Sequence, residues 1–434
     1  MGKVLWSSKN LSSKKGSWSP KAALLAEGKK NIKEATMRRK IPNWILPVLC
    51  ASFLLVFALA LMLTPQKEYS AEENRALTTA PTLTAASLLD GTYTRTLGDY
   101  FADQFPLRAG FVRLKARCEQ LLFGQENNGV IFGKGGYLIP RQEYTEAEYA
   151  VLDRNLAAAQ QLAQALADNA ATAQIPTVFA PVPRSIDVNR SKLPRRYDVQ
   201  QSDAVWEHLQ NASLVQSQGY VDFRVPLIEA AERGAQVWFR TDHHWTTEGA
   251  YLAYVALGEV LGYTPYDRAD FTPEAVSDQF LGTTYSKAGL IAAQPDTIAL
   301  WRYDTDSDYT TEIWENGSPV TTIDGFYDAA ALDGKDQYSV FLGGTRAHIR
   351  VLPPKNADLP TLLVIKDSYA QSLAPFLSRH YKLILIDPRS YRPTANQPSV
   401  LALIEQECPD AVLLLCGIDT LCGDVDLRTL LVGK

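Results

Sequence analysis

The chain has 434 residues, 46% of them hydrophobic, and a formal net charge of −5 at pH 7. That is enough apolar sequence to bury one large core or two smaller ones, and the lack of low-complexity tracts or a fixed-period repeat excludes a disordered chain and a solenoid. The charge is uneven, because residues 1–40 contain eleven Lys and Arg against Glu27 and Glu34.

We interpret residues 1–41 as a basic cytoplasmic tail. Its charges are not regularly interleaved with aromatic residues, so the tail predicts no nucleic-acid partner. Membrane topology and attraction to anionic lipid explain its charge instead.

Residues 42–64 are predicted to form a transmembrane anchor. The stretch from Trp44 to Thr64 contains no charged residue and is long enough to cross about 30 Å of hydrocarbon as a helix. Basic residues crowd its N-terminal side, which predicts a cytoplasmic N-terminus and an extracellular remainder. A cleavable signal is the alternative, but its apolar core would be shorter, and "LMLTPQKEYS" has no small-x-small cleavage site.

Residues 65–84 are polar and turn-rich and are interpreted as a stalk, and residues 85–434 as the extracellular domain. This domain begins with two amphipathic segments, followed by a predicted hairpin over 128–140 and a long helix over 147–166. Apolar strand candidates then alternate with helices: "IPTVFAPV", "YVDF", "TLLVIK", "KLILID" and "AVLLLC". This alternation predicts an α/β fold with a mostly parallel sheet flanked by helices. Residues 265–350 break the rhythm and are expected to form an irregular or β-rich insertion.

The cysteines leave two possibilities open. Cys416 and Cys422 are spaced for a small disulfide, but Cys416 ends an apolar strand-like run where a buried free thiol is equally expected. Whether Cys118 or Cys408 is paired is also open. No pair has the CxxC spacing of a zinc site.

The sequence "TDHHW" at 241–245 contains two of the five histidines. The first interpretation gives His243 and His244 a structural role, as packing or capping residues before a helix that starts near Thr246 or Thr247. A metal site is a second reading, but adjacent side chains diverge and no further ligands complete a tetrahedral set. The third is an Asp-x-His dyad, in which Asp242 orients His244 while His243 points the other way.

A dyad requires a nucleophile, and "TLLVIKDSYAQSLAPFL" supplies a candidate. Ser368 lies where an apolar strand ends and a helix begins, which is where open α/β sheets place ligand sites and where helical N–H groups can stabilise an oxyanion. A helix cap is the alternative role for Ser368. Its combination with the Asp-x-His loop favours catalysis.

Together these motifs resemble the DHHW family, named for Asp242-His243-His244-Trp245. That family is similar to the AlgJ/AlgX-type alginate O-acetyltransferases, which have an SGNH-hydrolase-like, flavodoxin-like fold. Supporting stretches are "EENRAL", "FADQFPLR", "NGVIFGKGGYLI", "FLGTTYSKAG", "VIKDSYAQSLAPFL" and "LILIDPRSY".

The resemblance implies Ser368 as nucleophile, His244 as general base and then acid, and Asp242 as its orienting carboxylate. Tyr369 and Arg389 are candidates for oxyanion or substrate binding. The alternative for Arg389 is an ion pair with Asp387 in a surface turn. His243, Trp245 and Asp367 are expected to support the site. Lys366 stands where the esterase motif "GDS" has glycine, which places the usual oxyanion geometry in question. No metal or cofactor is expected.

These residues predict an extracellular enzyme that transfers acetyl groups to polysaccharide hydroxyls through an acetyl-serine. Because acetyl-CoA is cytosolic, the resemblance implies a membrane-bound O-acyltransferase partner that supplies acetyl. The cell surface of a Gram-positive bacterium is the expected location. An acetylesterase with the same triad, or a non-catalytic polysaccharide-binding subunit, remains the alternative.

Overall fold

The computed structural model describes residues 42–70, 72, 75–122, 124–195, 197–216, 219–289 and 293–430. It divides into two compact units, one ending at Pro65 and the other starting at Gln66. The predicted basic tail, residues 1–41, lies outside the described residues.

The described part of the first unit contains one long helix, α2 (Ile45–Leu63). Its 19 residues are uncharged, all except Ser52 are apolar, and none is buried against other parts of the protein. At about 1.5 Å per residue the helix is about 28 Å long, which is close to the thickness of the hydrocarbon layer of a bilayer. Helix α2 therefore fits a single-pass membrane anchor.

Short elements open the second unit. A two-residue strand pair, β1 (Tyr69–Ser70) and β2 (Arg75–Ala76), precedes helices α3 (Ala85–Leu89), α4 (Thr92–Asp103) and α5 (Arg108–Leu121). A three-stranded antiparallel sheet follows: β3 (Glu126–Asn127), β4 (Val130–Phe132) and β5 (Leu138–Pro140). The pairing of β4 with β5 confirms the hairpin predicted over 128–140.

The central sheet has seven strands. Their order across the sheet is β10 (Ser318–Asp324), β9 (Thr310–Glu315), β11 (His348–Leu352), β13 (Lys382–Ile386), β12 (Thr361–Lys366), β14 (Ala411–Leu415) and β6 (Thr177–Phe179). The pairs from β13 to β6 are parallel, and those from β10 to β13 are antiparallel. The expectation of a mostly parallel sheet is therefore only partly met, since the sheet is mixed.

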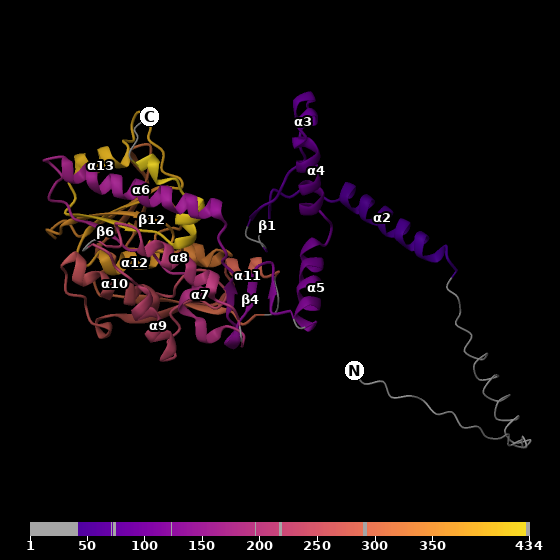
Figure 1. Ribbon diagram of the computed structural model, residues 1–434, viewed down its shortest axis with the longest axis horizontal. Coiled ribbons are helices and arrows are strands. Elements are labelled where there is room, and N and C mark those ends of the chain that lie inside the picture. The colour runs from indigo at the N-terminus through magenta and orange to yellow at the C-terminus, as the bar shows by residue number, and fades with distance from the viewer. Residues whose placement is uncertain are drawn as a thin grey trace, which may run out of the picture. The chain divides into compact units, whose positions relative to one another are not determined.

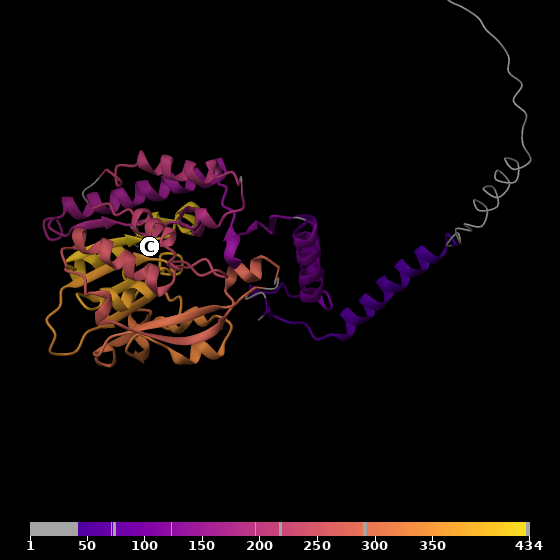
Figure 2. The same cartoon turned by 90° about the horizontal axis from the view of Figure 1, so that it is seen from below.

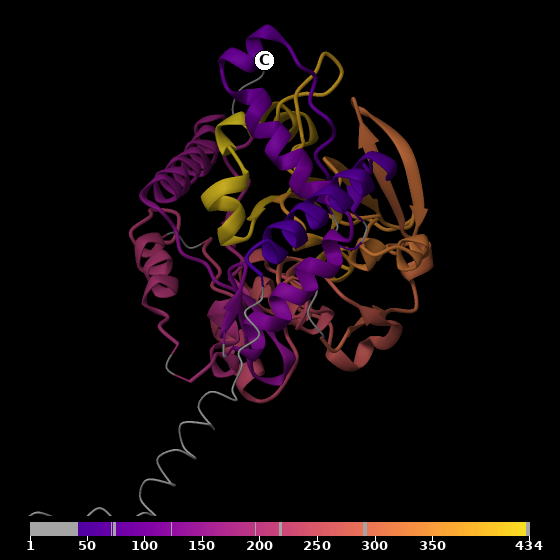
Figure 3. The same ribbon diagram turned by 90° about the vertical axis from the view of Figure 1, so that its right-hand side faces the viewer.

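The antiparallel half comes from the segment that interrupts the strand–helix rhythm. Strands β9 and β10 are joined through Asn316 and Gly317, whose φ angles of 48° and 81° are those of a tight two-residue hairpin turn. Figure 3 shows these strands in orange at the right-hand edge of the molecule. Instead of forming a separate insertion, this hairpin and β11 extend the main sheet.

Helices cover both faces of the sheet, as Figures 1 and 2 show. Helices α6 (Glu146–Asp168), α8 (Gln200–Gln210) and α13 (Val400–Glu407) pack on one face, and α9 (Arg224–Glu232), α10 (Thr247–Leu261) and α12 (Ala370–Leu377) on the other. Successive side chains of β12 alternate between these layers, because neighbouring strand residues point to opposite faces. Leu362 to Lys366 are all buried, which explains the apolar run from Leu362 to Ile365.

Two short helices and a ribbon complete the described unit: α7 (Ser185–Val188), α11 (Thr283–Lys287), and β7 (Thr272–Phe280) paired with β8 (Asp296–Arg302). The prediction of a strand from "YVDF" is wrong, since the described segment forms only one isolated β-bridge, between Tyr220 and Phe179. The Asp222 carboxylate accepts a hydrogen bond from the Arg224 amide at 2.9 Å, and this turn starts α9 where a strand would have continued.

All five cysteines are free thiols. Cys416 and Cys422 are both buried and are not bonded to each other. The structure therefore has the buried free thiol at Cys416 and not the disulfide.

Candidate active site

Two loops at the carboxyl edge of the sheet form the site. Ser368 lies in the turn between β12 and α12, and residues 242–245 precede α10. Helix α10 begins at Thr247 with Thr246 as its N-cap, as the sequence predicts. The two histidines therefore do not cap the helix, and both side chains are available to the site.

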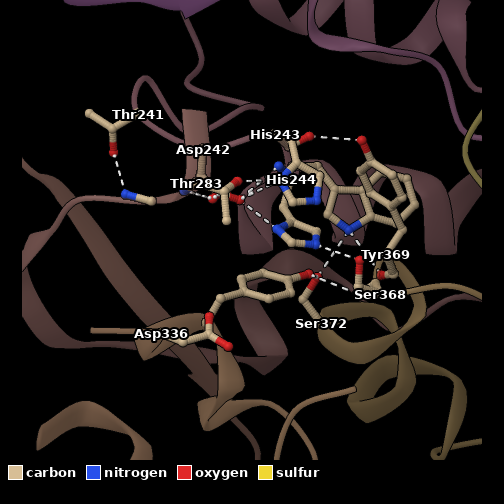
Figure 4. Close-up of polar contacts among 12 residues, drawn as sticks. Thr241, Asp242, His243, His244, Thr283, Asp336, Ser368, Tyr369 and Ser372 are labelled. Carbon is tan, nitrogen blue, oxygen red and sulfur yellow. Dashed lines mark hydrogen bonds and ion pairs between the residues drawn. The ribbon is translucent and has the colours of Figure 1, made fainter. Parts of the chain in front are cut away.

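Figure 4 shows Asp242, His244 and Ser368 as a continuous hydrogen-bonded chain. His244 Nδ1 lies 2.5 Å from Asp242 Oδ1, and His244 Nε2 lies 2.6 Å from Ser368 Oγ. Because an ionised carboxylate can only accept, Nδ1 carries the ring proton, and Nε2 is left to accept the hydroxyl proton of Ser368. The three residues predicted as nucleophile, base and orienting acid are thus brought together.

Asp242 is almost fully buried, at 2% exposure, and both of its oxygens accept hydrogen bonds. Besides the imidazole, Oδ2 accepts from the Thr283 amide at 2.7 Å and from the Thr283 hydroxyl at 2.9 Å. Burial opposes ionisation of this carboxyl, but the neighbouring histidines and these hydrogen bonds hold its pKa well below the usual range. Asp242 is therefore an anion in a fixed orientation.

His243 differs from its prediction. It does not point away from His244, because the chain bends through residues 241–244 instead of running extended, so adjacent side chains do not diverge. Its ring centroid lies 3.8 Å from that of His244, and its Nδ1 lies 2.6 Å from Thr283 Oγ1. Crowding by protein atoms and the charge of His244 lower the pKa of His243 to about 4, although the side chain is 42% exposed.

Tyr338 packs flat against the other face of His244. The two rings are stacked with centroids 3.9 Å apart and planes 10° apart. The Tyr338 hydroxyl lies 2.9 Å from Ser372 Oγ and 3.4 Å from the carbonyl oxygen of Ser368. Tyr338 therefore contacts both the base and the nucleophile turn.

The nucleophile turn is held from two sides. Asp367 accepts hydrogen bonds from the Tyr369 amide (3.1 Å), the Gly417 amide (2.6 Å) and the Thr420 hydroxyl (2.8 Å). Trp245 Nε1 donates to the Tyr369 carbonyl at 3.2 Å and to Ser372 Oγ at 3.0 Å. Asp367 and Trp245, two of the three residues predicted to support the site, thus hold the turn in place.

These contacts change the assignment of the oxyanion donors. The Tyr369 amide is already engaged by Asp367. The Ser368 amide has no hydrogen-bond partner among the described residues. In this turn the amide of Ser368, and not that of Tyr369, is therefore placed to serve an oxyanion.

Arg389 combines its two predicted placements. It forms a bidentate pair with Asp387, at 2.9 Å and 2.7 Å, and it also lines the pocket beside Ser368. Burial opposes the charge of Arg389, but the hydrogen bonds and charge of Asp387 keep its pKa above the ordinary value. The fully buried Lys366 Nζ lies 3.6 Å from the Asp387 carboxylate and has no hydrogen-bond partner among the described residues.

A pocket of about 260 Å³ opens at the candidate nucleophile, and Thr283, Lys287, Ser368 and Arg389 are among its lining residues. Two larger hollows, of about 370 and 530 Å³, contain none of the residues of the Asp–His–Ser chain. The volume is below the roughly 300–1,000 Å³ of sites for drug-sized ligands, so the pocket suits one small group.

The pocket also holds Arg184 and Asp419 at its lining. Arg184 is bound by Asp187 at 2.9 Å and 2.7 Å, and Asp419 accepts a short hydrogen bond from the Tyr144 hydroxyl. Burial raises the pKa of Asp419. Three cationic side chains, Arg184, Lys287 and Arg389, and two carboxylates, Asp367 and Asp419, therefore line the pocket.

Asp242, His243 and His244 lie close enough together to ligate a metal ion. However, His244 Nδ1 is hydrogen-bonded to Asp242 Oδ1, and both His243 Nδ1 and Asp242 Oδ2 are hydrogen-bonded to Thr283. The arrangement matches a proton relay, because the imidazole connects the carboxylate to the hydroxyl in line.

Three residues of the site had no role in the predictions. Gly282 and Thr283 belong to the stretch "FLGTTYSKAG", which carried the family resemblance but no chemical motif. Tyr338 lies in "KDQYSVF", where no local pattern marks a stacking residue. These residues reach the site only through tertiary folding.

The geometry places the chain in a class: α/β proteins with a Ser-His-Asp arrangement at the carboxyl edge of the sheet, the constellation that serine hydrolases use on several folds. A family model described as DHHW protein matches residues 143–386, more than half of the chain. The chain belongs to the DHHW family.

Among relatives, the probable alginate O-acetylase AlgJ of Pseudomonas fluorescens is 25% identical over 188 residues, which is 43% of this chain and 45% of the relative. The match thus spans less than half the length of that protein.

Two solved structures share the fold. A DHHW family protein from Eubacterium siraeum has a TM-score of 0.55 and 19% identity, over 71% of this chain and 96% of the other. Bacillus cereus PatB1, solved with a sulfonyl adduct, has a TM-score of 0.54 and 19% identity, over 70% and 98%.

Proposed function

We propose that this protein is a membrane-anchored extracellular O-acetyltransferase that modifies polysaccharide hydroxyls through an acetyl-serine. The observation that carries the proposal is the aligned chain from Asp242 through His244 to Ser368, with contacts of 2.5 and 2.6 Å at the wall of a pocket. The similarity to probable alginate O-acetylases supports acetyl transfer as the reaction.

In the first half-reaction, Ser368 Oγ attacks the carbonyl carbon of an acetyl donor while His244 Nε2 takes the hydroxyl proton. The bond from the carbonyl to the donor's leaving group breaks, and His244 returns the proton to that group. Asp242 stabilises the imidazolium between these two transfers. The Ser368 amide is positioned in the nucleophile turn to donate to the oxyanion.

In the second half-reaction, a sugar hydroxyl replaces the leaving group. His244 Nε2 takes its proton, the sugar oxygen bonds to the acetyl carbon, and the acetyl–serine bond breaks with return of the proton to Ser368 Oγ. If water takes the place of the sugar, the same residues perform ester hydrolysis. The acceptor that reaches the acetyl-serine first therefore decides between transferase and esterase.

Two cationic side chains in the pocket are proposed to attract negative charge on the acceptor. Lys287 and Arg389 flank Ser368 in the pocket, where the low dielectric strengthens their attraction for an anionic group. The acidic exterior of the chain would otherwise disfavour such a glycan. The donor is proposed to come from a membrane-bound O-acyltransferase, because no acetyl-CoA is available outside the cell.

To test the proposal, the full chain in detergent is incubated with p-nitrophenyl acetate, either alone or together with an unacetylated polysaccharide as acceptor. We expect nitrophenol release, and an added acetyl group by intact mass, in the wild type but not in Ser368→Ala. Ser378→Ala is the matched control, since Ser378 is a buried serine at the end of α12 whose hydroxyl donates to the Ala374 carbonyl and not to His244.

Transfer of acetyl to an added polysaccharide, measured by mass or NMR, separates the transferase from the esterase, which would release acetate only. Equal inactivity of wild type and Ser368→Ala, with both folded, would favour a polysaccharide-binding subunit without catalysis.

A further inference from the structure

Helix α5 (Arg108–Leu121) packs on the rest of its unit through one face only. Ala116 on that face is fully buried in a cluster with Val130, Leu138 and Ala288. Figure 1 shows α5 beside β4 and α11, at the border of the unit. The residues that point away from this contact therefore face outward.

The outward face of α5 is apolar. Leu114, Cys118 and Leu121 follow a spacing of four and three, which brings side chains to one side of a helix, and Leu107 lies just before the first helical residue. Leu107, Leu114, Leu121 and the adjoining Leu122 are 77%, 58%, 78% and 79% exposed, and Cys118 is also exposed. We call these five residues the α5 stripe.

Basic residues border the α5 stripe on both sides. By helical geometry, Lys115 lies next to the stripe on one side and Arg117 on the other, with Arg108 and Arg113 beyond them. Glu119 is the only acidic residue in the helix, and it pairs with Lys115 at 3.1 Å. The residues of the helix carry a net charge of +3, in contrast to the acidic chain as a whole, and outside the helix Arg113 pairs with Glu72 at 3.0 Å and Arg108 lies 3.9 Å from Asp103.

We propose that the α5 stripe lies in the surface of a lipid bilayer that contains anionic lipids. An apolar stripe bordered by Lys and Arg is the pattern of helices that bury their apolar face at the headgroup boundary while the basic chains reach the phosphates. The same chain supplies α2, which ends at Leu63 and fits a membrane anchor. A second copy is less suitable as the occupant, because its stripe would bring a like charge of +3 against this one.

The proposal goes beyond acetyl transfer but rests on the proposed anchoring by α2. Three exposed cysteines allow both to be tested in one protein: Cys50 in α2, Cys118 in the α5 stripe and Cys408 after α13. Cys416 and Cys422 are buried. Variants of the full chain that keep one of the three exposed cysteines are labelled with an environment-sensitive dye in nanodiscs of phosphatidylglycerol and phosphatidylcholine, with or without doxyl-labelled lipid.

We expect the doxyl lipid to quench the dye at Cys118 at least about twofold, with little effect at Cys408. Cys50 reports separately on the anchor. Quenching at Cys118 without quenching at Cys50 would support bilayer docking of α5 and contradict the anchor. Quenching at Cys50 but not at Cys118 would overturn the docking and retain the anchor.

A paired substitution tests the apolar contact itself. Leu114→Glu with Leu121→Glu should abolish the quenching at Cys118, whereas Val225→Glu with Val320→Glu, at apolar positions of similar exposure elsewhere, should not. Replacement of phosphatidylglycerol by neutral lipid should weaken it. Formation of a Cys118–Cys118 disulfide between chains, with no lipid quenching, would assign the α5 stripe to a second copy and overturn the proposal.

Discussion

Asp242 shows how a single buried carboxylate can organise the candidate site. One oxygen holds the imidazole of His244 and the other is held by Thr283, so rotation of the carboxylate would cost hydrogen bonds at both ends. Hydrogen bonds to a charged group are worth about 1.5–3 kcal/mol, which is enough to fix one rotamer. The orientation of His244 follows from that of Asp242.

Asp242→Asn should abolish most catalysis while retaining shape. An amide at this position can donate a proton to His244 Nδ1, which favours the wrong tautomer and leaves Nε2 protonated toward Ser368. We expect a loss in kcat of about 10³–10⁴-fold by p-nitrophenyl acetate turnover, the order seen for this change in serine proteases. A loss below about tenfold would show that Asp242 does not set the tautomer.

Thr283→Val should lower kcat by about 10–100-fold, because it removes a hydroxyl that donates to a charged carboxylate but keeps the backbone amide. The neighbouring Thr284→Val is the matched control, since Thr284 also lines the pocket but forms no hydrogen bond to Asp242. Equal activity of the two variants would show that the hydroxyl of Thr283 does not contribute to catalysis.

At the scale of elements, the site depends on close packing between loops. The chain before α11 passes directly over Asp242: a methyl group at Gly282 would lie 2.2 Å from Asp242 Oδ2 and 2.4 Å from its Cβ. No real contact is that short, so either the α11 loop or Asp242 must move when a side chain is added. The glycine is required by this approach and not by its backbone, which is extended.

Gly282→Ala should therefore reduce activity by more than tenfold while the fold is kept, because Asp242 would be displaced from His244 by about 1 Å. Gly98→Ala is the control, as Gly98 lies within α4 with open space around it, and alanine there should stabilise by about 0.5–1 kcal/mol. Turnover and thermal melting measure both effects. Unchanged activity in Gly282→Ala would contradict the close approach.

The strand ends add a second packed element. Lys366, Asp387 and Arg389 connect β12 to the loop after β13, so the residue that replaces the esterase glycine is part of a buried charge cluster. Burial lowers the pKa of Lys366, and burial opposes the charge on Asp387, whose pKa nevertheless falls below its usual value because of Arg389 and Lys366. This cluster positions Arg389 at the pocket.

At the scale of the whole molecule, buried histidines couple stability to pH. His348 packs against Trp314 and Tyr391, and its Nδ1 has no hydrogen-bond partner in the described chain. Burial lowers the pKa of His348 to about 3. His380 is stacked on Tyr263, and burial lowers its pKa to about 4. Both are neutral in the folded protein at pH 7.

These histidines predict a loss of stability in mild acid. Below the unfolded pKa of about 6.5 the unfolded chain binds protons that the folded chain does not, so stability falls as pH drops from about 6.5 toward 4. Each histidine contributes at most about 1.4 kcal/mol per pH unit in that window. His348→Phe with His380→Phe should flatten the fall of Tm between these pH values. An unchanged slope would contradict the prediction.

The sequence alone determined the features that depend on local pattern. An uncharged apolar run sets the span of α2, apolar runs set β12, β13 and β14, and Thr246 sets the start of α10, because hydrophobic periodicity and capping act over a few residues. The DHHW motif and the stretch "VIKDSYAQSLAPFL" led to the prediction of Asp242, His244 and Ser368 through local sequence and family resemblance.

Only the tertiary structure decided how distant segments meet. The 2.6 Å contact joins His244 and Ser368, which are 124 residues apart in the sequence. No local chemical motif predicts the contacts of Tyr338 with His244 or of Thr283 with Asp242. The antiparallel half of the sheet and the position of His243 likewise depend on strand pairing and on a bend in the chain, which local pattern does not encode. Side chains converge where the fold packs them, and packing is a property of the whole chain.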